Sequence, residues 1–148
     1  MKKTLYVHKK LLNGKDFVDW AKKQGFTSVL DAKDLHCTIM FSKKEVEWST
    51  IEKDRTSLRV KGGKRTVEPL GNEGAVVLKF QSDKLKERWQ YYLDHGCSFD
   101  YDDFTPHVTI TYNGTDLDLS NVQPYHGPLE FGPEIMKEVD YSWHKNKK

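Results

Sequence analysis

The sequence has no long apolar run, little cysteine and almost no net charge. Its wholly apolar runs are a few residues long, so no segment is expected to span a membrane. Two cysteines, Cys37 and Cys97, are too few for a disulfide framework. The 24 Lys and Arg residues exceed the 22 Asp and Glu residues by two, which does not suit a protein that coats duplex DNA. The basic segment from Met1 to Tyr6 lacks the apolar part of a secretory signal. We therefore expect a protein of the reducing cytoplasm, with neither a membrane nor duplex DNA as partner.

What the sequence does contain is enough for one folded unit. Its 148 residues predict a single domain over residues 1–148, built from two lobes at most. A chain of this length buries roughly 70% of its unfolded surface without needing disulfides or metals. Aromatic residues make up 12% of the chain, which argues against disorder.

Apolar periodicity and turn residues predict strands and helices in a repeating order. Alternation over residues 5–8 predicts a strand with Tyr6 and His8 on one face. Asn13 and Gly25 bracket one expected helix, and Ser82 and Gly96 bracket another. Each helix precedes a strand that carries a histidine, which indicates a weak internal duplication. Further strands are expected at 26–30, 35–41, 75–80, 107–112, 129–131 and 135–141, with a hairpin of 58–60 and 65–67 about Gly62-Gly63 and a turn or two of helix in 45–52.

Two short motifs are the most informative feature of the sequence. Leu35-His36-Cys37-Thr38-Ile39 and Pro106-His107-Val108-Thr109-Ile110 both read His, apolar, Thr, apolar. Residues i and i+2 of a strand share a face, so each strand presents an imidazole beside a hydroxyl and turns its apolar residues into a core.

Such a pair suits phosphodiester chemistry. Imidazole titrates near pH ~6.5, so one histidine can act as base while the other acts as acid. The hydroxyls of Thr38 and Thr109 can donate hydrogen bonds to non-bridging phosphate oxygens. RNA-like substrates fit best because their 2′-hydroxyl is an internal nucleophile beside the phosphate. The sequence leaves open which of His36 and His107 is the first base.

Other chemistry fits less well. Zinc is disfavoured because Cys37 faces away from His36 and the chain has no paired cysteine motif. A nucleophilic role for Cys37 is disfavoured because the thiol should be buried and inert. The acidic segment 100–103 lacks the glycine and distal glutamate of a calcium loop and is typical of a solvated loop. Neither a Walker A nor a GxGxxG motif is present, so no nucleotide cofactor is implied.

The paired motifs resemble those of the 2H phosphoesterases, a family named for two His-x-Thr/Ser motifs. Residues 104–110 are especially similar to the second motif of that family, and Phe131-Gly132-Pro133-Glu134 is similar to its C-terminal part. The resemblance covers residues 5–143 and implies an α+β fold of two pseudo-symmetric lobes, each an antiparallel sheet with helices outside, around a central groove. Within the family the chain most resembles phage anti-CBASS nucleases, which degrade cyclic di- and trinucleotide messengers of antiphage defence.

This resemblance implies cleavage of 3′–5′ linkages without a metal or cofactor, through a 2′,3′-cyclic phosphate to a linear 3′-phosphate, in the cytoplasm of a bacterial host. His36, Thr38, His107 and Thr109 take the catalytic places. Two alternatives remain open: a 2′,3′-cyclic phosphodiesterase or ligase acting on RNA ends, and a protein that sequesters cyclic nucleotides without cleaving them. Base preference and oligomeric state do not follow from the sequence.

Three residues are candidates for substrate binding. Tyr6 and Trp143 offer aromatic faces on which bases can stack, and Glu138 offers an acceptor to a base edge. Tyr6 and Trp143 could equally be packing residues, and in one regular strand Glu138 and Trp143 would face opposite ways. Three lysines could lie near phosphates or simply be solvated: Lys9, Lys10 and Lys15.

Overall fold

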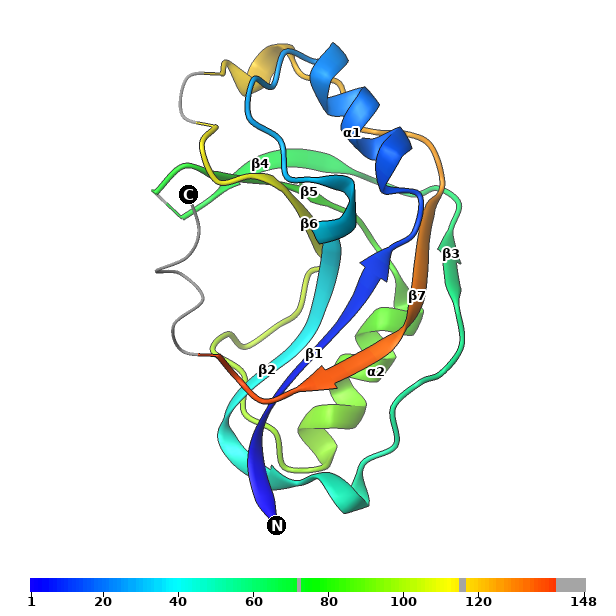
Figure 1. Cartoon of the computed structure of the whole chain (residues 1–148), viewed down its shortest axis with the longest axis vertical. Helices are drawn as coiled ribbons and strands as arrows, with labels where there is room; N and C mark the ends of the chain where they lie inside the picture. The colour runs from blue at the N-terminus through cyan, green and yellow to red at the C-terminus, as the bar shows by residue number, and fades with distance from the viewer. Residues whose placement is uncertain (72, 115–116, 141–148) are drawn as a thin grey trace.

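The computed structural model describes residues 1–71, 73–114 and 117–140. Within this part of the chain there are seven strands and two α-helices, with short 3₁₀ turns between some of them (Figure 1). The elements are β1 (Lys2–Leu11), α1 (Gly14–Lys23), β2 (His36–Glu47), β3 (Leu58–Val60), β4 (Thr66–Leu70), β5 (Ala75–Lys79), α2 (Asp83–Asp94), β6 (His107–Thr111) and β7 (Leu129–Lys137).

The strands form two antiparallel sheets. The first has the order β2-β1-β7-β3 and the second the order β4-β5-β6, so β1 lies inside the first sheet and β5 inside the second. β1 pairs with β2 on one side and with β7, from the far end of the chain, on the other. No helix in the described ranges is both long enough and apolar enough to cross a membrane.

The order strand, helix, histidine-bearing strand occurs twice. β1-α1-β2 gives it once and β5-α2-β6 gives it again, and in each case the two strands are antiparallel neighbours. The predicted α+β class, with antiparallel sheets in two similar halves, is confirmed. The repeat matters for the site because it places the two motifs at equivalent positions.

The two helices begin differently. The Ser82 hydroxyl accepts a hydrogen bond from the Leu85 amide at 3.2 Å, so the predicted cap of α2 is confirmed. Asn13 precedes α1 but its side chain makes no capping bond. Instead its amide nitrogen donates to the Pro128 carbonyl at 2.7 Å and its oxygen accepts from the Glu130 amide at 3.1 Å. Asn13 thus ties the start of α1 to the start of β7.

Both helices stop at the predicted glycines. Gly25 has φ of 102° and Gly96 has φ of 98°, a region of backbone conformation that side-chain-bearing residues rarely adopt. The helices therefore end where the sequence indicates.

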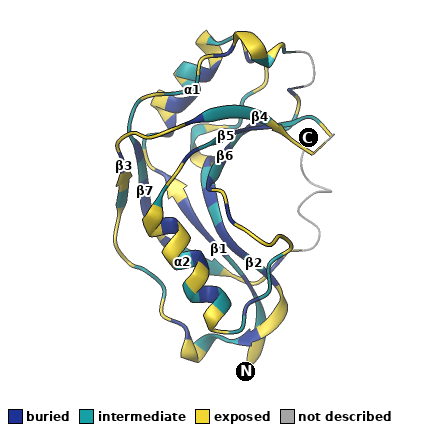
Figure 2. Ribbon diagram, turned by 180° about the vertical axis from the view of Figure 1, so that it is seen from behind, coloured by how far each residue is buried: buried dark blue, intermediate teal, exposed yellow. Residues whose placement is uncertain are grey.

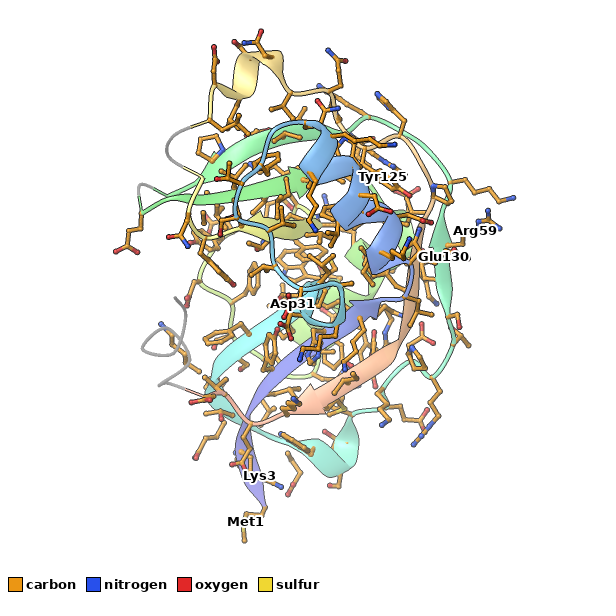
Figure 3. The ribbon with its side chains drawn as sticks, turned by 45° about the horizontal axis from the view of Figure 1, so that its top comes forward. Met1, Lys3, Asp31, Arg59, Tyr125 and Glu130 are labelled. Atoms are coloured by element: carbon orange, nitrogen blue, oxygen red, sulfur yellow. The ribbon has the colours of Figure 1, made fainter. Side chains whose placement is uncertain are left out.

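The core lies between the sheets and the helices. Tyr125 lies beside α1 (Figure 3). Its ring centroid is 5.7 Å from that of Phe17 and 5.9 Å from that of Trp20, both on α1. α2 lies against the first sheet, with its outward side exposed (Figure 2). It is fixed to β7 by Arg88, which donates two hydrogen bonds of 2.8 and 2.9 Å to the fully buried carboxylate of Glu134.

Several predicted elements are wrong. Residues 26–30 form no strand. The turn or two of helix expected in 45–52 is confirmed only as one 3₁₀ turn at Trp48–Thr50, since β2 extends to Glu47. The hairpin about Gly62-Gly63 does not form, because β3 pairs with β7 and β4 pairs with β5. The two expected last strands are one continuous strand, β7. In each case long-range pairing or burial overrides the local pattern.

Candidate active site

The two motif histidines stand at the first positions of β2 and β6. These strands belong to different sheets but lie against each other (Figure 1). The backbone amide of His107 donates a hydrogen bond to the Cys37 thiol. His36, Thr38, His107 and Thr109 are all half-buried, and Cys37 is fully buried behind them. We call the surface that carries the four motif side chains the histidine face. The predicted alternation of the two motifs is thus confirmed.

Each motif imidazole is held in the same way. Nδ1 of His36 lies 2.8 Å from the carbonyl oxygen of Asp34, and Nδ1 of His107 lies 3.2 Å from that of Thr105. In both cases the carbonyl belongs to the residue two positions earlier. Since a carbonyl only accepts, each ring carries a proton on Nδ1, and Nε2 is the nitrogen that can take up or give up a proton. A bare Nε2 is the atom that a general base uses.

The surroundings of His107 favour its neutral form. Burial lowers its pKa, and the positive charges of Lys79 and His36 act in the same direction, while the bond to Thr105 opposes them. Lys79 is itself paired with Glu68 at 3.1 Å. His107 is therefore unprotonated at neutral pH.

Each motif threonine is paired with a tyrosine. The hydroxyls of Tyr6 and Thr38 are 3.2 Å apart, and the Tyr112 phenol is hydrogen-bonded to Thr109. Burial raises the pKa of Tyr6 to about 12 and also raises that of Tyr112, so both phenols stay protonated at neutral pH. Ionisation of Tyr112 raises the pKa of Tyr6 further, so the two phenols lie near each other. A phenol that donates to each threonine leaves the threonine proton free for a phosphate oxygen.

A lysine stands directly across from each motif histidine. In the β1–β2 ladder Lys10 is opposite His36, and in the β5–β6 ladder Lys79 is opposite His107. Directly opposed residues point to the same face of a sheet, so both lysines flank the histidine face. Of the three candidate lysines, Lys10 is thus opposite a motif histidine, and its contact with phosphate stays a prediction. Sequence reasoning missed Lys79, because its position depends on register.

The other two candidate lysines have partners outside the histidine face. Lys9 is completely buried, and its ammonium group donates to the carbonyls of Thr56 and Gly132 at 2.9 and 3.1 Å. Lys15 is exposed and lies 3.5 Å from Asp19 on the same helix. The suggestion that these two lysines bind phosphate is therefore wrong for Lys9, and Lys15 is placed as a solvated residue.

An aromatic cluster adjoins His36. The Tyr6 ring stacks on His8 with centroids 4.9 Å apart, and His8 meets His36 edge-on at 5.3 Å. Phe41, opposite Tyr6 in the ladder, packs on it at 5.9 Å. The sequence analysis placed His8 on the Tyr6 face but gave it no role, because it lies outside the His-x-Thr pattern. The signal that could have found it is the alternation that places His8 on the Tyr6 face.

The three substrate-binding candidates have different outcomes. Tyr6 lies on the histidine face, in contact with Thr38. Glu138 is exposed just beyond the end of β7, between Lys137, which pairs with Tyr6, and Val139, which bonds to the Thr4 hydroxyl at 3.1 Å. Glu138 therefore lies beside the part of β1 that carries Thr4 and Tyr6. Trp143 lies outside the described residues.

The disfavoured chemistries gain no support. Cys37 is fully buried, and burial raises its pKa to about 12, which fits the expected inert thiol. Over the described ranges, no three His, Cys, Asp or Glu side chains are grouped as metal ligands would be. Asp100 and Asp103 of the acidic loop pair with Lys43 and Lys86 at 3.5 and 3.3 Å, as solvated surface residues do.

Two pockets lie near the sheets. A pocket of about 180 Å³ borders the histidine face, since Lys79 and Thr105, the neighbours of His107, form part of its wall. A pocket of about 550 Å³, lined by Trp48 and Met136 among others, contains no histidine. Neither of these pockets is lined by a motif histidine or threonine.

Comparison with known proteins places the chain in a family. The family model described as anti-CBASS protein Acb1 matches residues 3–146. A relative of that name from Caulobacter sp. (strain RHG1) is 48% identical over 147 residues, which is 96% of this chain and 23% of the relative. One from Sphingomonas paeninsulae is 45% identical over 146 residues, 94% of this chain and 23% of the relative. This chain thus spans less than a quarter of the length of these two relatives. One from Enterobacteria phage T4 is 29% identical over 86 residues, 58% of this chain and 55% of the relative.

Solved structures share the fold at low sequence identity. A crystal structure of a phosphoesterase superposes with a TM-score of 0.68 and 13% identity, covering 95% of this chain and 90% of that chain. Escherichia coli LigT complexed with NADP+ gives a TM-score of 0.65 and 14% identity, covering 95% and 89%. The predicted 2H phosphoesterase-like fold is confirmed. Since the family model covers nearly the whole sequence, this chain belongs to the anti-CBASS protein Acb1 family.

Proposed function

We propose that this chain is a metal-independent phosphodiesterase that cleaves 3′–5′ linkages of cyclic di- and trinucleotide defence messengers. In this proposal residues 1–148 act as one 2H-like domain in the cytoplasm of a bacterial host, where loss of the messenger lets phage evade CBASS immunity. The observation that carries the proposal is the repeated imidazole geometry: two histidines, each held at Nδ1 by a carbonyl two residues earlier, with Nε2 free. The family names of the relatives point to the same class of substrate.

The proposed first step opens the ring of the messenger. Nε2 of one histidine takes the proton of a ribose 2′-hydroxyl, and that oxygen attacks the adjacent phosphorus. The bond from phosphorus to the 5′-oxygen breaks, and the other histidine, protonated, gives its proton to that oxygen. The product is linear and ends in a 2′,3′-cyclic phosphate. We assign the first proton abstraction to His107, because its lowered pKa favours the neutral form that a base needs.

In the second step the roles reverse. The histidine that gave its proton now takes one from water, the water oxygen attacks phosphorus, and the 2′-oxygen leaves with the proton held by the other histidine. The product is a linear 3′-phosphate, and both imidazoles return to their starting forms. Thr38 and Thr109, each oriented by a tyrosine, would donate to the non-bridging oxygens that gain charge in both steps.

Substrate binding would use the remaining candidates. Tyr6 presents an aromatic ring beside Thr38, and Lys10 and Lys79 add positive charge next to the two histidines. Glu138 and Trp143 remain proposed contacts to the bases.

The test is a product assay in EDTA. The protein is incubated with 3′,3′-cyclic GMP–AMP and with a cyclic trinucleotide, and the products are resolved by mass spectrometry. Linear products ending in 3′-phosphate support the proposal. Intact ligand recovered bound at about one per site indicates a sequestering protein, and ligand neither cut nor bound points to RNA ends.

Matched variants assign the chemistry. His36→Asn and His107→Asn should each lose nearly all turnover while still binding the messenger. His126→Asn changes an exposed histidine away from the motifs and should behave as the wild type. Retention of near-wild-type turnover by either motif variant would contradict the paired mechanism.

A further inference from the structure

A third histidine lies on the histidine face and is not part of either motif. His8 stands on β1 directly opposite Thr38, and only 7% of its surface is exposed. Its ring fills the space between Tyr6 and His36, at centroid distances of 4.9 and 5.3 Å. In the other half of the molecule the residue opposite Thr109 is Val77. The repeated scaffold therefore does not require an imidazole at this position.

The surroundings of His8 determine where its proton sits. Its Nδ1 is buried and has no hydrogen-bond partner among the described residues. A neutral imidazole has one N–H and one bare nitrogen, and a buried N–H without an acceptor is costlier than an unused lone pair. The proton therefore belongs on Nε2. This tautomer is opposite to that of His36 and His107, whose Nδ1 atoms face carbonyls.

His8 remains neutral over the working range of pH. Burial is the main cause that lowers its pKa to about 4, and the charges of His36 on β2, Lys137 on β7 and Lys10 on β1 lower it further. These groups are all cationic or able to become so. A neutral N–H donor surrounded by positive charge suits an anionic ligand, and it cannot compete with His36 or His107 for the transferred proton.

We propose that His8 is a third catalytic residue, which donates a hydrogen bond from Nε2–H to a non-bridging phosphate oxygen held between Thr38 and His36. This inference rests on the proposed function, and it implies that the two halves of the site contribute differently. The half that carries His36 offers a fixed imidazole donor as well as a threonine hydroxyl, whereas the half that carries His107 has Val77 in the equivalent place. Charge that develops on the phosphate would therefore be stabilised chiefly on the His36 side.

Two substitutions separate hydrogen bonding from packing. H8F keeps a planar ring against Tyr6 and His36 but has no N–H, while H8Q loses the ring but carries an amide donor at the distance of Nε2. In the EDTA assay we expect kcat of H8F to fall about 100-fold, the effect of losing one preorganised donor, with little change in KM. We expect H8Q to keep more of the wild-type kcat than H8F. H126F and H126Q, at an exposed histidine, should match the wild type.

The outcomes distinguish this inference from the proposed function. A wild-type protein that leaves the messenger intact overturns both. If the wild-type protein cleaves the messenger and H8F is at least as active as H8Q, only the role of His8 is overturned. Should H8F fail to fold, ¹⁵N NMR of the wild-type imidazoles tests the inference by showing which nitrogen of His8 carries the proton. We expect His8 to carry its proton on Nε2 and His36 and His107 to carry theirs on Nδ1, and a proton on Nδ1 of His8 would refute the inference.

Discussion

The buried ion pair that joins α2 to β7 allows a quantitative test of what holds the first sheet together. The carboxylate of Glu134 has no exposed surface, and the guanidinium side chain of Arg88 is only 15% exposed. Arg88 donates two parallel hydrogen bonds to this carboxylate, of 2.8 and 2.9 Å. Glu134 also accepts from the Tyr92 hydroxyl at 2.5 Å and from the Asp54 amide at 2.8 Å. One carboxylate thus connects α2, β7 and the loop before β3.

Removal of the charge at Glu134 should lower the free energy of unfolding substantially. In the wild type, burial lowers the pKa of Arg88 and its bonds to Glu134 raise it. The variant loses those bonds, but a guanidinium is not deprotonated in proteins, so Arg88 stays charged without its partner. Breaking a buried pair by removing one partner costs about 3–5 kcal/mol, because the other charge is left buried and uncompensated. In E134Q the amide oxygen can still accept from Tyr92 and Asp54, so we expect a loss near the lower limit, about 3 kcal/mol. That is a large part of the total stability of a domain of this size.

A double-mutant cycle in urea checks the reasoning. We expect R88M and E134Q to be strongly destabilised singly, and the double variant to be more stable than the sum of the two losses predicts, by about 2–3 kcal/mol. D19N, which breaks the exposed pair with Lys15, should not change the unfolding midpoint measurably. Strictly additive losses at Arg88 and Glu134 would refute the view that the stabilisation comes from their pairing.

Three further predictions concern stability and reactivity. S82A removes the bond that caps α2 through Leu85 and should cost about 1 kcal/mol, seen as a lower thermal midpoint, whereas an unchanged midpoint would argue against the cap. His8 has a folded-state pKa of about 4 against an ordinary value of 6.5, so the unfolded chain binds the proton first and stability falls as pH drops from about 6.5 to 4. The full shift corresponds to about 3 kcal/mol, and urea unfolding of H8Q at pH 7.5 and 4.5 should show a smaller difference than the wild type. Cys37 and Cys97 are buried with raised pKa values, so iodoacetamide should label them only after denaturation, and rapid labelling of the native protein would contradict their burial.

The site could be predicted from sequence where the signal is local. The spacing of His36 and Thr38 fixes a common face on any strand, and the same holds for His107 and Thr109. The cap at Ser82 is also a local signal. These predictions did not depend on knowing which strands pair.

The parts that failed depend on long-range pairing. Gly62-Gly63 is typical of a hairpin turn, yet the strands on either side of it join different sheets. The positions of Lys79 and His8 beside the motif residues follow from ladder register, which one sequence does not display. Asn13 has the residue type of a helix cap, but its side chain bonds to the start of β7.

The central position of β1 in its sheet has a consequence for biosynthesis. β1 is made before β2, its first neighbour, but its second neighbour, β7, is made more than a hundred residues after β1. Until β7 emerges from the ribosome, the strand that carries Tyr6 and His8 has an open edge, and the carboxylate that anchors α2 is missing. The histidine face is therefore completed only after β7 has been made. Chains truncated before Leu129 should carry both His-x-Thr motifs and yet lack a formed active site.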